Sequence, residues 1–359
     1  MPRWTICSAA CLFVSMSTIA QQADFALGAR AGYGYLIAHH DNLKRMVDGH
    51  IPSIELYYER VVSGRQAWHR SYKSPSWGMS FYAADLRAEE LGNAFALTPY
   101  LLLPLTFDDR QSLDLRFGWG LGVVTHPFDK ETNYKGHAIG STVNVHMLLG
   151  LEYRRHFGRT SIGVGLGINH LSNGAFRVPN LGVNLPAVQL SVRREIGTRQ
   201  PADTTGFRGG GIANGPQRLF AYATVGIKET FPVNSGKHMA YALVVAATKP
   251  FGGKIQLEGG LDVFHNTSLE QRAQEDGQEP PSTLTQAGVH VGGGLMLRKL
   301  TIIWQAGVYV FNSFSEDGMV FNRVGFRHTI GQRWLVNFTL KTHLATADHF
   351  ELGFGYRFR

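Results

Sequence analysis

The stretch that decides the fold runs from residue 113 to residue 123 and reads LDLRFGWGLGV. Every odd-numbered position from Leu113 to Val123 is apolar, whereas the even-numbered positions are Asp114, Arg116 and three glycines. A period of two with one apolar face is the signal of a β-strand. Charge and glycine on the opposite face are typical of a barrel strand that turns its apolar side outward and its polar side inward.

The same alternation recurs along the chain, for example in residues 143–154 and 334–343. Short connections such as 298–299 alternate with longer ones such as 126–139, as periplasmic turns alternate with outer loops in outer-membrane barrels. We expect an all-β fold, a transmembrane antiparallel β-barrel of about 16 strands, with 12 or 14 strands as alternatives. The even number puts both chain ends in the periplasm.

Two connections break this alternation, because residues 63–76 and 198–216 are long but fall on the side with short turns. The second is either a disordered turn or a strand pair outside the count of 16. No boundary requires a second domain, so residues 21–359 are expected to form one outer-membrane β-barrel.

The composition excludes several other classes of protein. The 359 residues contain 42 glycines and only 17% charged residues, and no apolar run is long enough for a membrane-spanning helix. The net charge of +8 fits either a solvated surface or attraction to anionic lipid head groups. The absence of a basic run or an aromatic platform speaks against nucleic acid as a partner.

The two ends of the chain carry signals for export and assembly. Residues 1–20 are typical of a secretory signal peptide, whose removal also removes Cys7 and Cys11; acylation of Cys11 is the alternative. Residues 350–358 alternate and end in an aromatic residue, which resembles the signal that the outer-membrane barrel assembly machinery recognises.

A candidate site lies where the strand of residues 160–172 ends. His170 and Ser172 are two positions apart, so their side chains share the apolar outer face. A serine hydroxyl becomes a good nucleophile when a base takes its proton, and a third group must orient that base. Asn184 lies on the same face of the following strand, across the hairpin. The competing interpretation is that Ser-Asn-Gly at a strand end is ordinary turn chemistry.

Residues 170–184, HLSNGAFRVPNLGVN, make the first interpretation more specific. The pattern resembles the signature of the outer-membrane lipid A deacylases, also called acyloxyacyl hydrolases. This resemblance covers one hairpin strongly and residues 341–358 more loosely. It implies an enzyme that cuts an ester-linked acyl chain from lipid A. It also implies roles for individual residues: Ser172 as nucleophile, His170 as general base, backbone N–H groups of Gly174 and Ala175 as oxyanion hole, Asn180 holding their loop, and Asn173 in support.

Two features depart from that family. Its best-known members are eight-stranded barrels, and this chain is about twice as long. Its third catalytic residue is an acid, whereas this chain has Asn184, and Glu195 lies on the opposite face. An amide can orient an imidazole but cannot offset its charge. Two alternatives therefore stay open, a passive channel or hydrophobic-solute transporter, and a barrel with a degenerate site.

The resemblance further implies the surroundings of the protein. The expected substrate is lipid A or lipopolysaccharide, and the expected location is the outer membrane of a Gram-negative bacterium, with the loops and the active site toward the cell surface. No cofactor and no metal is expected, because the loop histidines His39, His40 and His50 lack a familiar ligand spacing. A homodimer is kept as an alternative to a monomer.

Overall fold

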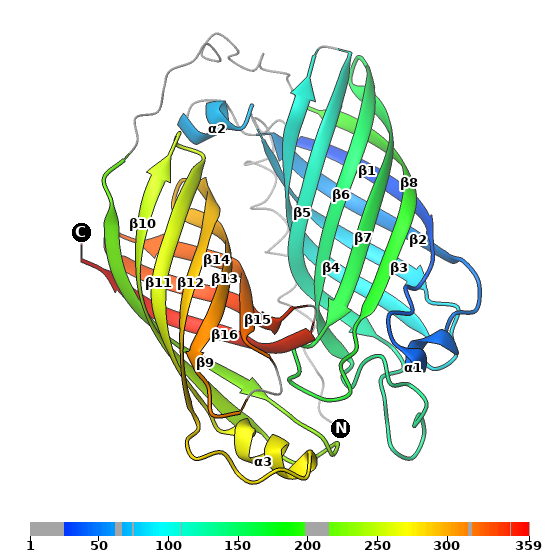
Figure 1. Cartoon of the computed structure of the whole chain (residues 1–359). Coiled ribbons are helices and arrows are strands. Elements are labelled where there is room, and N and C mark those ends of the chain that lie inside the picture. Colours follow the sequence, from blue (N-terminus) through cyan, green and yellow to red (C-terminus); the bar gives the residue numbers. More distant parts are fainter. Residues whose placement is uncertain are drawn as a thin grey trace, which may run out of the picture.

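The computed structural model describes residues 25–61, 67–73, 75–108, 110–197, 215–314, 318–344 and 346–358. Its strands form two closed antiparallel barrels of eight strands each (Figure 1). The N-terminal barrel consists of β1 (Phe25–Gly34), β2 (Ile51–Val61), β3 (Ser76–Asp85), β4 (Asn93–Phe107), β5 (Gln111–Val124), β6 (Val143–Phe157), β7 (Thr160–Ser172) and β8 (Val183–Ile196).

The C-terminal barrel repeats this plan. It consists of β9 (Arg218–Lys228), β10 (His238–Phe251), β11 (Ile255–Asn266), β12 (Thr285–Leu297), β13 (Leu300–Phe311), β14 (Val320–Ile330), β15 (Trp334–His343) and β16 (Thr346–Arg357). Among the described residues, three short helices lie between strands: α1 (Asp41–Lys44), α2 (Ala67–Ser71) and α3 (Ser268–Glu275). None of these described helices has the length and apolar character that crossing a membrane requires.

The strand number expected from the sequence is confirmed, but the strands close as two rings instead of the single barrel expected over residues 21–359. Phe25 of β1 pairs with Ile196 of β8, and Gly226 of β9 pairs with Glu351 of β16. The long stretch 198–216 that broke the alternation connects the two rings; most of it, residues 198–214, lies outside the described residues, as does the expected signal peptide. Closure depends on pairing between distant strands, so local alternation cannot reveal it.

The two faces of each barrel differ as the alternation predicts. Apolar side chains such as Leu121, Leu166 and Val291 are more than 60% exposed on the outer surface. Inner positions carry polar residues and glycines together with buried apolar residues such as Leu148 and Phe264. At Gly163, an added Cβ would lie only 2.5 Å from Glu152 Oε1, so glycine makes room for the charged interior.

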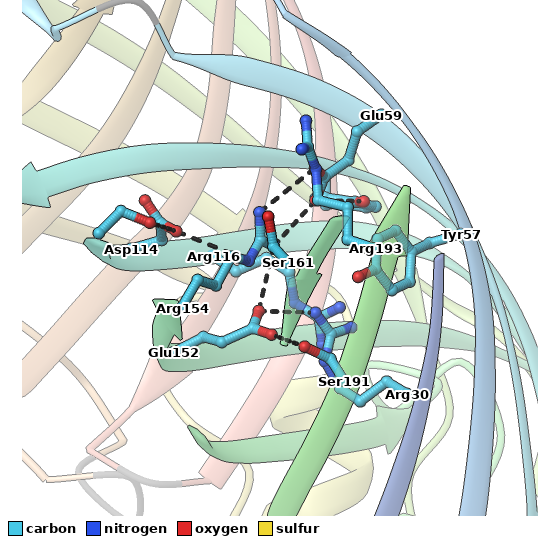
Figure 2. Close-up of polar contacts among 12 residues, drawn as sticks. Arg30, Tyr57, Glu59, Asp114, Arg116, Glu152, Arg154, Ser161, Ser191 and Arg193 are labelled. Carbon is cyan, nitrogen blue, oxygen red and sulfur yellow. Dashed lines mark hydrogen bonds and ion pairs between the residues drawn. The ribbon is translucent and has the colours of Figure 1, made fainter. Parts of the chain in front are cut away.

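Ion pairs fill the interior of the N-terminal barrel. Figure 2 shows many of the residues involved, which project from several strands toward one another. Glu59 Oε1 lies 3.0 Å from Arg154 Nη2 and its Oε2 lies 2.6 Å from Arg193 Nε, while Arg30 Nη1 lies 2.9 Å from Glu55 Oε1. The C-terminal barrel is similar, with Arg323 between Asp262 and Glu351 at 2.7 Å from each.

This packing removes the physical basis for a pore. The charges that could line a channel are buried in the two interiors: Asp114, Arg116, His146, Glu152, Arg154, Glu258 and Asp262. An eight-stranded barrel has an interior just wide enough for side chains. The channel interpretation depended on a single ring of sixteen strands, and the chain does not form one.

The two barrels lie side by side (Figure 1). On the outer face of β5, the Trp119 ring lies 5.2 Å from that of Phe326, 5.7 Å from that of Phe338 and 6.1 Å from that of Phe350. We call the end that carries α1, α3 and the β5–β6, β7–β8 and β9–β10 connections the loop end. At the opposite end, Tyr72 Oη donates a hydrogen bond to Lys254 O over 2.7 Å.

Candidate active site

His170 and Ser172 lie at the loop end of β7, on the face that looks away from the barrel interior. Ile162, Val164 and Leu166 on the same face are exposed, whereas the intervening Asn169 is buried in the interior. The alternation of β7 thus continues unbroken from apolar residues to a histidine and a serine. The polar pair lies where this apolar surface meets the loop end.

Asn184 lies directly across the hairpin from His170. The two residues are register partners in the β7–β8 pair, and His170 Nδ1 lies 2.7 Å from Asn184 Oδ1. Because a carbonyl oxygen only accepts, the imidazole donates its Nδ1–H, and a neutral ring then carries its lone pair on Nε2. The amide therefore selects the tautomer in which Nε2 can act as a base.

His39 is the neighbour of this pair that sequence reasoning missed. Its Nε2 lies 2.9 Å from Leu181 O, and its Nδ1 lies 3.2 Å from Ile37 O and 3.4 Å from Asn184 Nδ2. The sequence pattern offers His39 only as a candidate metal ligand. In the described part of the chain, no group of three or more His, Cys, Asp or Glu side chains could hold a metal ion. His39 and Asn184 are 145 residues apart in the sequence, so no local sequence pattern indicates that they lie side by side.

Ser172 is fixed by two hydrogen bonds to its hydroxyl oxygen. The backbone N–H of Gly174 and the Nδ2 of Asn180 each donate to Ser172 Oγ over 3.2 Å. The side chain is only 4% exposed. The two donors fix the orientation of the hydroxyl, and they stabilise negative charge that develops on its oxygen when the proton leaves.

The 173–180 loop that follows Ser172 is held from within by two asparagines. Asn180 Oδ1 accepts the Asn173 N–H over 2.9 Å, and Asn173 Nδ2 donates to Arg177 O over 2.9 Å and to Ser141 Oγ over 2.8 Å. Asn180 is thus the residue that ties the start of the loop to its end.

The backbone at Gly174 and Ala175 has an unusual conformation. Both residues have positive φ, +61° and +54°. For alanine this left-handed conformation costs about 1–3 kcal/mol, and such strain persists only where the surroundings enforce it. Successive backbone N–H groups in a turn conformation can form a small anion-binding concavity.

The structure joins the residues singled out in this hairpin into two separate hydrogen-bonded groups, and within the described part of the chain no hydrogen bond links Ser172 to His170. His170 and Asn184 are bonded to each other, and Ser172 and Asn180 are bonded to each other. Gly174 and Ala175 lie in the loop between them. The hairpin thus contains candidates for a base, a nucleophile and backbone donors, which are the parts that acyl transfer needs.

Comparisons with known proteins assign each barrel separately. The profile of the family described as lipid A 3-O-deacylase (PagL) matches residues 53–193, and that of the acyloxyacyl hydrolase C-terminal domain matches residues 217–359. No curated protein matches the chain.

Solved structures that match part of the chain include the following two. The alignment with the outer membrane enzyme PagL covers 46% of this chain and 97% of that protein, with 17% identity and a TM-score of 0.34. The alignment with Neisserial surface protein A covers 48% of this chain and 97% of that protein, with 9% identity and a TM-score of 0.35.

Proposed function

Because the chain belongs to the outer-membrane lipid A deacylase family, we propose that it is an esterase that removes an ester-linked acyl chain from lipid A, with Ser172 as the nucleophile. The observation that carries this proposal is the alignment of His170, Ser172 and Asn184 on the outer face of one hairpin. A site that faces outward can meet a substrate embedded in the membrane.

The reaction begins with attack of Ser172 Oγ on the ester carbonyl carbon while His170 Nε2 takes the hydroxyl proton. The carbonyl oxygen becomes an oxyanion, and the N–H groups of Gly174 and Ala175 stabilise it. The Gly174 N–H donates to Ser172 Oγ before the attack and turns to the oxyanion as the new bond forms. When this intermediate collapses, the bond to the sugar oxygen breaks and the imidazolium returns its proton to that oxygen. A water molecule, activated by His170, then hydrolyses the acyl-serine and releases the fatty acid.

Asn184 orients His170 in this scheme but does not neutralise it. Its Oδ1 holds the Nδ1–H at 2.7 Å, so the base keeps the correct tautomer. When the imidazolium forms, an amide offers a dipole where an acid would offer a charge. In a serine protease the same exchange of acid for amide costs about 10⁴ in rate. The proposal therefore includes a turnover slower than an enzyme with a carboxylate would reach.

The surface beside the site suits an acyl chain. Down the outer face from His170 lie Ile168 and Leu166, and the neighbouring strand contributes Leu149. An acyl chain lying along this surface would keep its contact with apolar groups. The proposal places the loop end at the cell surface, because lipid A occupies the outer leaflet. Recognition by the barrel assembly machinery and formation of a homodimer stay predictions.

Mass spectrometry of lipid A tests the proposal. Outer membranes that contain the native protein should lack one acyl mass, and membranes with Ser172→Ala should keep it. Ser161→Ala is a matched control, because Ser161 lies on the inner face of the same strand. Identical spectra for the native protein and Ser172→Ala, with both folded, would favour the degenerate barrel.

A further inference from the structure

We propose that the C-terminal barrel is a positioning module for the active site, because it holds the 173–180 loop in the conformation that stabilises the oxyanion. The inference rests on the proposed function and gives the second barrel a role in it. The contacts come from the β9–β10 loop, residues 229–237, and from Phe350 of β16.

The β9–β10 loop donates hydrogen bonds to backbone carbonyl oxygens of the 173–180 loop. Glu229 donates its backbone N–H to Ala175 O over 2.8 Å. Lys237 Nζ donates to Phe176 O, and the same ammonium lies 4.4 Å from the centroid of the Phe176 ring. Two successive carbonyl oxygens of the 173–180 loop are therefore held by the other barrel.

The gripping residues are themselves fixed. Lys237 Nζ lies 3.1 Å from Glu229 Oε2, and the Glu229 side chain is only 3% exposed. Glu229 Oε1 also accepts the backbone N–H of Asn234, which closes the β9–β10 loop on itself. A second link runs the other way, because Lys130 Nζ of the β5–β6 connection donates to Val233 O over 2.7 Å.

Phe350 limits the loop from its other side. An added Cβ at Gly174 would lie 2.5 Å from Phe350 Cδ2 and Cε2, so the ring touches the backbone at this point. The Phe350 ring is stacked on that of Phe338, with 5.5 Å between the ring centroids, and its centroid lies 6.1 Å from that of Trp119. The ring is therefore held by aromatic neighbours from both barrels and cannot move aside freely.

These contacts matter because the loop adopts a strained backbone. Gly174 and Ala175 have positive φ, and such a conformation persists only when its surroundings enforce it. Donors to an oxyanion help only if they are already in place when the charge develops. Lys237 and Glu229 do not touch the reacting atoms, so they are positioning residues and not catalytic ones.

The experiment compares Lys237→Ala with Lys237→Arg, and uses Lys249→Ala as the control. Lys249 is also exposed and lies near the far end of β10. With purified full-length protein and lipid A in detergent micelles, Lys237→Ala should lower kcat about tenfold and leave KM unchanged. Full loss of an oxyanion donor costs about 10²–10³, so a displaced donor should cost less. Lys237→Arg keeps a cationic donor and should restore kcat, and Lys249→Ala should match the native protein.

Hydrogen–deuterium exchange of peptides that cover residues 173–180 gives a readout without substrate. Exchange there should be faster in Lys237→Ala than in the native protein and in Lys249→Ala, because the loop loses the hydrogen bond from Lys237 that holds its backbone in place. Unchanged exchange, or a change in KM with kcat unaffected, would overturn the inference. If the native protein does not hydrolyse lipid A, the proposed function fails, and the exchange measurement still decides whether the C-terminal barrel holds the loop.

Discussion

Replacing Asn184 with aspartate should make the site faster, because it supplies the charge that the amide lacks. The substitution is nearly isosteric, and Asn184 Oδ1 already lies 2.7 Å from His170 Nδ1. Asn184→Asp therefore keeps the acceptor in place and changes mainly its charge. The carboxylate would stabilise the imidazolium, which exists only after Ser172 has lost its proton. The gain should appear in kcat.

The size of the gain follows from the distance between the charges. With charge centres about 4 Å apart, the attraction is about 1 kcal/mol at the dielectric constant of water and about 4 kcal/mol at an effective value of 20. Since about 1.4 kcal/mol corresponds to a factor of ten in rate, kcat should rise between about fivefold and about a thousandfold. A half-buried position such as that of Asn184 lies between these limits.

The assay is release of fatty acid from lipid A by the purified protein in detergent micelles, with Asn184→Leu as the control. Leucine removes the acceptor altogether, so kcat should fall below the native value. Asn184→Asp combined with His170→Ala should stay inactive, because the new charge has no imidazolium to stabilise. A folded Asn184→Asp protein whose kcat is equal to or below the native value would refute the reasoning.

Two further substitutions test the frame around the site. Asn180→Ala removes both the acceptor for the Asn173 N–H and a donor to Ser172 Oγ. In the same assay kcat should therefore fall about 10- to 100-fold, and an unchanged kcat would contradict the role of the loop. Glu59→Ala leaves two buried arginines, Arg154 and Arg193, without their shared partner. The free energy of unfolding of the N-terminal barrel, measured with urea, should fall by about 3–5 kcal/mol, and a fall below about 1 kcal/mol would contradict the account of its interior.

The sequence predicted the parts of the fold that depend on local pattern. Alternation in residues 113–123 and 160–172 is enough to assign the outer face, since a strand has a period of two. The same rule placed Asn184 on the outer face with His170, and the structure pairs the two residues directly.

Features that depend on distant pairing could not be predicted in this way. Outer and inner faces look alike in one ring of sixteen strands and in two rings of eight, so the pairing of Phe25 with Ile196 leaves no local trace. The long stretch 198–216 was the one signal, and it permitted more than one interpretation. His39 beside Asn184 and Lys237 beside Phe176 were missed for the same reason, since each contact joins separate segments of the chain.

The central claim is that Ser172 is a nucleophile activated by His170, and labelling with a fluorophosphonate that carries an alkyl chain tests it most directly. Peptide mass spectrometry of the labelled native protein should find the adduct on Ser172. Labelling should be absent in Ser172→Ala and much slower in His170→Ala, but unchanged in Ser161→Ala, which alters a hydroxyl on the inner face of the same strand. A native protein that is folded and stays unlabelled, or that carries the adduct on another residue, would contradict the account.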